Sequence, residues 1–416
     1  MVQALNLVDP QAFADGPPHD FFDLVRREDP LYRIDDPRYG TLWNLTRLSD
    51  IRKVSANNTL FSSAGGVMYP LAPPQGAPFQ NNMIYHNGAR HNRLRNLVQG
   101  ALTPRVVAQF DGWIRDVCVQ IVARVKELKS FDVIPVIAAE LPAQVISSLL
   151  GIPEEDRDKL LKWAVDVFGR MDPEVGFAGY LAARQEAGAY AIGLRDLKLR
   201  RPAADLATEM LSAAPKGEPI TDGEYQETIF LIMLAGFETT HTLIAQSLLL
   251  MAQNPDVQRQ VDDAPIDSLR NVLDELLRYV SPVMHMARTA TDDVEMHGKT
   301  IRKGDHVLTW FTAANRDPEA HVDPHRFDAN RASAKAHMAF GGGGIHYCVG
   351  ASLAKLEVEI LLQEFRKAGI RLELDGTPQR AVDVAINALR KLPMRLAGTS
   401  ASLPDGRPSI AGRGEG

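Results

Sequence analysis

The chain has few cysteines and little net charge. Its 416 residues include two cysteines, Cys118 and Cys348, which lie far apart in the sequence. A structural zinc site needs several Cys or His ligands at close spacing, and a redox pair needs two neighbouring cysteines, so the sequence favours neither. The formal net charge of -6 gives no general attraction to nucleic acid, because that binding depends on Lys and Arg neutralising phosphates. We therefore expect no nucleic-acid partner.

The sequence also lacks long apolar runs. No uninterrupted apolar segment approaches the roughly 20 residues that span a bilayer. Residues 1–20 contain no basic stretch followed by an apolar one, so they do not resemble a signal peptide. Two separate cysteines agree with a reducing compartment. We therefore expect a cytoplasmic protein without a membrane anchor.

The remaining composition is that of a globular protein, with 45% hydrophobic and 24% charged residues. The length alone would allow two or three domains, but no internal boundary or repeat is visible. We therefore expect one domain over residues 1–397. Residues 398–416 are rich in Gly, Ser, Pro and Arg and have no apolar periodicity, which predicts a disordered tail.

Most of the middle of the chain has the apolar period of helices, with short connections marked by Pro or Gly. Residues 41–60, 286–311 and 370–396 favour strands or mixed structure instead. Within the second of these segments, residues 300–310 contain a turn between two β-prone runs, which predicts a hairpin. The sequence therefore predicts a mainly α protein with small β-sheets.

One long helix is predicted over residues 222–253. Thr221 and Glu224 form a capping-box pattern at its start. Its apolar middle is interrupted by Gly236 and Glu238, although an interior glycine costs about 1 kcal/mol relative to alanine and a buried carboxylate costs more unless it is paired. Local conflicts of this kind tend to mark functional sites.

Cys348 lies in a glycine-rich run, residues 340–350, which is followed by a segment with helical periodicity. Glycines reach positive φ without strain and let the backbone approach a flat ligand closely. Loop amides and the positive end of the following helix would stabilise a thiolate. Two interpretations remain open from these residues alone. Cys348 is either the axial ligand of a haem iron or a structural cysteine beside a flexible loop.

Four motifs together resemble the cytochrome P450 family, and the similarity extends from about residue 21 to residue 396. The Cys348 loop is similar to the haem-binding loop of that family, although the distance from Phe340 to Cys348 is one glycine longer than usual. The other three motifs precede this loop and occur in the expected order along the chain. They are His91 to Arg95 for the propionate-binding helix, Ala235 to Thr240 for the oxygen-binding helix, and Glu275 to Arg278 for the Glu-x-x-Arg pair.

The resemblance implies the cytochrome P450 fold, triangular-prism-like, with haem b between a long distal helix and a proximal Cys-loop helix. It implies a soluble bacterial-type monooxygenase that hydroxylates a small or medium lipophilic substrate, such as a terpenoid, steroid, branched lipid or alkyl aromatic. Oxygen and two electrons would be needed, the latter from NAD(P)H through a separate ferredoxin and ferredoxin reductase. We expect a monomer. The alternatives are a peroxide-driven enzyme and a haem protein that binds ligands without catalysis.

The resemblance also implies a role for individual residues. Cys348 would be the iron ligand, with Thr239 and Glu238 managing proton delivery during oxygen activation. Without the resemblance, Thr239 could simply hydrogen-bond its own helix while Glu238 reaches solvent. Haem contacts are implied for the following residues: His91, Arg95, Ala235, Gly236, Arg288, Phe340, Gly341, His346 and Gly350.

Two further groups are implied, one structural and one lining the substrate pocket. A buried Glu275–Arg278 pair would be completed by Arg326 and would stabilise the fold, whereas the same spacing in an ordinary helix is a surface ion pair. The basic residues around His91 could equally form a charged surface for a redox partner. Core packing is the alternative for each residue of the expected substrate wall: Met68, Tyr69, Met83, Val283, Met284, Met286 and Ile386.

Overall fold

The computed structural model describes residues 5–71, 81–212 and 218–398; the expected tail at 398–416 lies almost wholly outside them. The described chain is mainly helical, as the sequence predicts. The α-helices are α1 (His19–Glu28), α2 (Leu48–Ala56), α3 (Gly88–Gln99), α4 (Pro104–Val107), α5 (Asp111–Glu127), α6 (Glu140–Leu150), α7 (Arg157–Phe168), α8 (Gly176–Arg200), α9 (Leu206–Ser212), α10 (Asp222–Gln253), α11 (Pro255–Asp263), α12 (Leu269–Val280), α13 (Phe311–Ala314) and α14 (Ala351–Ala368).

The strands form small sheets. A five-stranded sheet has the order β1-β2-β8-β5-β3, a three-stranded sheet has the order β4-β12-β9, and two strand pairs are β6-β7 and β10-β11. The strands are β1 (Leu31–Asp36), β2 (Gly40–Leu45), β3 (Phe61–Ser62), β4 (Ser130–Asp132), β5 (His285–Ala290), β6 (Val294–Met296), β7 (Lys299–Ile301), β8 (His306–Trp310), β9 (Leu372–Leu374), β10 (Gln379–Arg380), β11 (Leu389–Lys391) and β12 (Pro393–Leu396).

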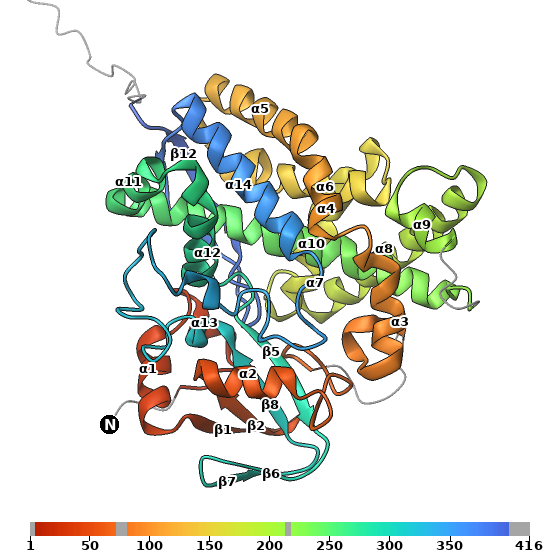
Figure 1. The fold of residues 1–416 in the computed structure, drawn as a ribbon, viewed down its shortest axis with the longest axis vertical. Coiled ribbons are helices and arrows are strands. Elements are labelled where there is room, and N and C mark those ends of the chain that lie inside the picture. Colours follow the sequence, from red (N-terminus) through yellow and green to blue (C-terminus); the bar gives the residue numbers. More distant parts are fainter. Residues whose placement is uncertain (1–4, 72–80, 213–217, 399–416) are drawn as a thin grey trace, which may run out of the picture.

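Helix α10 runs through the centre of the molecule, with α5, α6 and α14 on one side and the five-stranded sheet with α1 and α2 on the other (Figure 1). The predicted bounds of this helix are confirmed. Its capping box is also confirmed, because the Thr221 side chain accepts from the Glu224 N–H and the Glu224 carboxylate accepts from the Thr221 N–H. Among the described residues α10 is the one helix long and apolar enough to cross a membrane, and 78% of its most apolar window is buried inside the protein.

The predicted hairpin at residues 300–310 is wrong. Strand β7 pairs with β6, whereas β8 pairs with β5 and β2 in the larger sheet. The tight turn lies earlier, at His297 and Gly298, which have φ of 51° and 72°. Two consecutive residues with positive φ match the right-handed twist of a two-residue hairpin, so the strands reverse there.

Candidate active site

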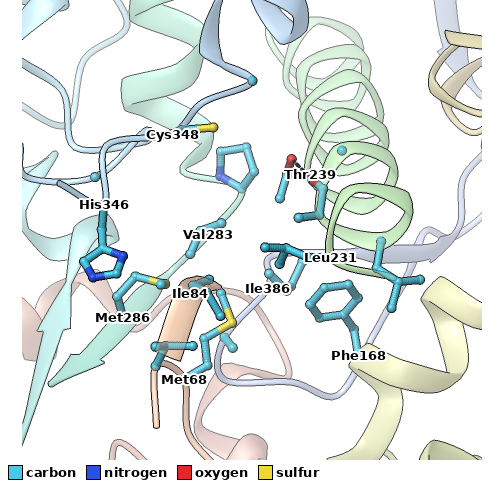
Figure 2. A pocket seen from close by; sticks show the side chains of 18 of the residues that line it. Met68, Ile84, Phe168, Leu231, Thr239, Val283, Met286, His346, Cys348 and Ile386 are labelled. Carbon is cyan, nitrogen blue, oxygen red and sulfur yellow. Dashed lines mark hydrogen bonds between the residues drawn. The ribbon is translucent and has the colours of Figure 1, made fainter. Parts of the chain in front are cut away.

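A cavity of about 1140 Å³ lies between α10 and the loop that carries Cys348. Figure 2 shows side chains converging on it from several elements: Cys348 and His346 from the loop, Thr239 from α10, and Met68, Phe168 and Ile386 at other points of its wall. These residues are far apart in the sequence. The fold therefore gathers the predicted motifs around one space, as the resemblance implies.

The loop before α14 follows a path that requires glycine. Gly341, Gly343 and Gly344 have φ of 97°, 96° and 74°, a region that side-chain-bearing residues rarely adopt. Phe340 stays close to Cys348 despite the extra glycine, because the Cys348 N–H donates to the Phe340 carbonyl at 3.0 Å. A Cβ atom on Gly344 would lie 2.7 Å from the carbonyl oxygen of Ser55 in α2. The longer loop therefore fits closely against α2.

Cys348 lines the cavity, and its side chain is accessible from the cavity and not packed in the core. Burial raises the pKa of its thiol, while the N–H groups of Gly350 and Ala351 and the charge of Arg95 act in the opposite direction. The helix and loop thus supply the expected stabilisation of a thiolate, but they do not outweigh burial by themselves. Binding to a cation such as iron would supply the missing stabilisation.

Basic side chains gather at the same end of the cavity. Arg288 is buried, which lowers its pKa to about 10. Burial and the charges of Arg288, His91 and Arg95 lower the pKa of His346 to about 3. In the described parts of the chain neither Arg95 nor Arg288 has a carboxylate within 4 Å. Such a group of basic residues without acidic partners fits an anionic ligand.

These residues fit haem. A soft thiolate ligand, a glycine-lined approach and unpaired guanidinium groups match the iron and the two propionates of haem b. Arg95, Arg288 and His346 would hold the propionates. His91 differs from the others, because both of its ring nitrogens lie within hydrogen-bonding distance of backbone carbonyls, those of Met83 at 3.0 Å and Ile345 at 2.9 Å.

Thr239 lines the cavity from α10, on a different wall from Cys348 (Figure 2). Its hydroxyl donates to the carbonyl of Ala235 at 2.7 Å, so it occupies the helix-bonded arrangement that the sequence left open. Gly236 also lines the cavity, but a Cβ atom there would lie 2.5 Å from Cδ1 of Ile146. The close approach of α6 is therefore a sufficient reason for glycine at this position.

Glu238 points into the protein and not to solvent. Its side chain is 4% exposed, and Oε2 has no hydrogen-bond partner among the described residues. The nearest basic group is Nδ1 of the buried His241, at 3.6 Å, and both ring nitrogens of His241 are unpartnered as well. The Thr242 hydroxyl donates to the other carboxylate oxygen over 3.5 Å. Buried polar atoms of this kind usually bind ordered water, which makes this pair a candidate path for protons.

The Glu275–Arg278 pair is completely buried. Arg278 donates twice to the Glu275 carboxylate at 2.7 Å, and its remaining donors bind backbone carbonyls. The prediction that Arg326 completes the pair is wrong, because that side chain is 70% exposed. Arg331 takes this place, with Nε 3.0 Å and 3.1 Å from the two oxygens of Glu275. Arg326 contributes its backbone carbonyl, which accepts from both buried arginines.

The substrate wall is apolar, as expected, but two of its predicted members are wrong. Tyr69 and Met284 are absent from the cavity lining and belong to the core beside the five-stranded sheet, where the Tyr69 hydroxyl donates to Asp36 at 2.7 Å. Both positions neighbour a lining residue, and sequence alone does not show which of two neighbours faces inward. The other predicted members line the cavity: Met68, Met83, Val283, Met286 and Ile386.

Several polar residues of the site were missed in the sequence. His241 follows Glu238 by three positions, which places it on the same helix face, so this spacing could have revealed it. Arg331 lies 56 positions from Glu275, and nothing local distinguishes it from Arg326. Asp383 lines the cavity and accepts from the N–H groups of Ala385 and Ile386. Burial raises its pKa to about 6, because those hydrogen bonds only partly offset the loss of hydration.

Comparisons with known proteins agree with this geometry. The family model described as cytochrome P450 matches residues 193–366. The chain is 31% identical over 385 residues to the methyl-branched lipid omega-hydroxylase of Mycobacterium tuberculosis, covering 90% of both chains. It is 29% identical over 396 residues to the steroid C26-monooxygenase of Mycolicibacterium smegmatis, covering 92% of both.

The fold is similar to that of solved structures. A Mycobacterium marinum cytochrome P450 in complex with pseudoionone superimposes with a TM-score of 0.87 and 27% identity, covering 95% of this chain and 100% of that one. The predicted fold class is thereby confirmed. With relatives matched along nearly their whole length, the chain belongs to the cytochrome P450 family and is a monooxygenase whose cofactor is haem b.

Proposed function

We propose that the protein hydroxylates a lipid or steroid-like substrate at a carbon remote from its polar groups. The observation that carries this proposal is the apolar cavity that Cys348 and Thr239 share with Met68, Met286 and Ile386. Two relatives are named as an omega-hydroxylase of methyl-branched lipids and a steroid C26-monooxygenase. Methionine adapts to irregular shapes, so branched substrates suit this wall.

Bound haem would supply the activation of oxygen, and the residues of this chain would position the reactants and manage protons. Cys348 would hold the iron and donate electron density to it. The Thr239 hydroxyl, released from the Ala235 carbonyl, would donate a hydrogen bond into the cavity. Thr239 would pass a proton into the cavity, and Glu238 and His241 would replace it. The apolar wall would hold the reacting C–H bond near the iron while excluding water.

Electrons would come from NAD(P)H through a separate ferredoxin and its reductase, with the protein acting as a cytoplasmic monomer. The buried Glu238 and His241 favour this route over a peroxide-driven one, because peroxide brings oxygen that is already reduced together with its protons, so no proton delivery by the pair would be needed. They also favour turnover over simple ligand binding, which requires no proton path.

Turnover with defined electron sources tests the proposal. The purified haem protein is incubated with a branched fatty acid or a steroid, together with ferredoxin, reductase and NAD(P)H, or with hydrogen peroxide alone. We expect hydroxylated product with the electron-transfer proteins and little with peroxide. A Cys348→Ser variant should lose the thiolate signature of the reduced carbon monoxide complex and form no product. Product from peroxide alone, or full activity of that variant, would contradict the proposal.

A further inference from the structure

A basic side chain lies at the end of the cavity away from Cys348. Arg170 belongs to a short 3-10 helix, η7 (Gly169–Met171), that joins the end of α7 to the segment before α8. It lines the cavity, and its Nη2 donates to the carbonyl of Met68 at 3.4 Å. Figure 2 shows Met68 and Phe168 at the lower end of the cavity, opposite Cys348 at the upper end. Arg170, which follows Phe168 by two positions and reaches Met68, therefore lies towards the end of the cavity away from Cys348.

Arg170 forms no close ion pair with an acid of the described residues. Five arginines line the cavity: Arg38, Arg95, Arg170, Arg184 and Arg288. Arg38 pairs with Asp36 at 3.5 Å, and Arg184 pairs with both oxygens of Glu227 at 2.8 Å and 2.9 Å. Arg95 and Arg288 lie at the haem end. Within the described residues, Arg170 has no carboxylate within 4 Å.

Few other contacts hold the guanidinium of Arg170. One long hydrogen bond reaches the Met68 carbonyl, and the Tyr180 ring lies below the group at 5.9 Å from its centroid. A guanidinium offers five N–H donors in a planar fork that matches a carboxylate. Arg170 is half-buried and lines the cavity, and most of its donors have no acceptor among the described residues. A cation in such surroundings is stabilised strongly by an anion that brings two acceptor oxygens.

Asp383 is the competing partner, because it also lines the cavity and feels the charge of Arg170. Its carboxylate is already held by two backbone N–H groups. Burial nevertheless raises its pKa to about 6, whereas a closely paired arginine would hold it well below the ordinary range. The neighbouring Tyr85 and His285 are not acids that could neutralise Arg170, and burial raises the pKa of Tyr85 to about 12. Since the described residues include no ion pair within 4 Å between these two side chains, and the Asp383 carboxylate is held by its own backbone, Arg170 is not the close counterion of Asp383.

We propose that Arg170 binds the carboxylate of a lipid acid and so fixes the direction in which the substrate enters the cavity. The hydrocarbon then extends along Met68, Ile386 and Val283 towards Cys348 (Figure 2), and the carbon that reacts lies at the end remote from the carboxylate. This inference rests on the proposed function and adds to it the chemical class of the substrate and the orientation in which it binds.

Optical titration of the haem protein tests this role. The probes are palmitic acid, methyl palmitate and hexadecanol, which share one chain length and differ in the head group. Dissociation constants come from the shift of the haem absorption band. We expect the acid to bind at least about tenfold more tightly than the ester or the alcohol, because one charge-assisted, bidentate contact is lost in those two. In Arg170→Met the preference should fall to within about twofold, and Arg170→Lys should retain part of it.

The matched control is Arg38→Met, which removes a different cavity-lining arginine that already has an acidic partner and should leave the preference for the acid unchanged. Haem content and the thiolate signature of each variant show whether the site has formed. If they are normal, but the wild-type protein binds acid and ester equally, binds none of the three probes, or keeps its preference in Arg170→Met, this inference is overturned while the proposed function stands. A missing thiolate signature would instead overturn the proposed function.

Discussion

Two buried glutamates of this protein have opposite surroundings. Glu275 is completely buried and accepts from Arg278, from Arg331 and from the Asp328 N–H at 2.7 to 3.1 Å. Glu238 is nearly as buried, but its contacts are a Thr242 hydroxyl at 3.5 Å and a His241 nitrogen at 3.6 Å. Charges that are fully hydrogen-bonded hold one arrangement, whereas an unpaired carboxylate raises the free energy of the folded state. We infer that Glu275 maintains the fold and that Glu238 serves turnover.

Replacing Glu275 should have the largest effect on stability. Glu275→Gln keeps the size of the side chain but leaves Arg278 and Arg331 without a charge partner, so the free energy of unfolding should fall by about 3 to 5 kcal/mol. Urea denaturation followed by circular dichroism measures this change. Arg326→Ala is the control, because that side chain is exposed, and it should change the free energy of unfolding by less than about 0.5 kcal/mol. A loss below about 1 kcal/mol in Glu275→Gln would remove the contrast between the two glutamates.

Asp383 is a third buried carboxylate, and its raised pKa should make the stability of the protein depend on pH. The folded chain holds its proton up to about pH 6, whereas an unfolded aspartate ionises near 3.8. The folded state therefore binds more protons in this interval, and the free energy of unfolding should fall by about 3 kcal/mol as pH rises from about 4 to about 6. Asp383→Asn keeps an acceptor for the Ala385 and Ile386 N–H groups and should lose that part of the fall.

The measurement is a series of denaturation curves for wild type and Asp383→Asn between about pH 5 and pH 8, an interval that spans the upper part of the titration. The variant should gain stability relative to wild type as pH rises. A difference between the two proteins that stays constant with pH would show that Asp383 does not titrate in this interval.

Replacing His241 should lower turnover without lowering stability. In His241→Leu two unpartnered ring nitrogens are removed from the interior, so the free energy of unfolding should stay the same or rise by about 1 kcal/mol. Product formation should fall by about tenfold, because a group that feeds protons to the acid is lost. Rates of product formation and denaturation midpoints are measured on the same preparations.

Gln246 provides the matched control, since it is buried on the same helix but donates to the Asn387 carbonyl at 2.6 Å. Gln246→Leu should reduce the free energy of unfolding by about 1 to 3 kcal/mol and leave the product formed per electron unchanged. The reverse pattern, with His241→Leu unstable and fully active, would show that His241 is a packing residue.

The sequence predicted what depends on local pattern and motif. The capping residues and Pro255 set the ends of α10, and the glycine-rich run indicates the Cys348 loop. Arg95, Arg288 and His346, which the resemblance groups together, all line one cavity. Each of these predictions depends on a short segment whose backbone conformation is strongly restricted by its own residues.

The predictions that failed depend on long-range geometry. Arg326 and Arg331 are equivalent candidates in the sequence, and only the path of the loop after α13 decides which one reaches Glu275. Tyr69 and Met284 are each adjacent in sequence to a residue that lines the cavity, but their own side chains point into the core. No sequence pattern indicated a binding role for Arg170, because its lack of a close counterion is visible only when its spatial neighbours are known.

The product formed per NAD(P)H oxidised by Thr239→Ala tests the central claim most directly. Thr239 is the polar side chain through which Glu238 and His241 would act on the cavity, and alanine removes its hydroxyl while leaving the charges of the site unchanged. We predict that the variant binds haem and oxidises NAD(P)H normally but forms severalfold less product for each NAD(P)H consumed. An unchanged yield would contradict the claim that the unpaired polar groups of α10 deliver protons during turnover.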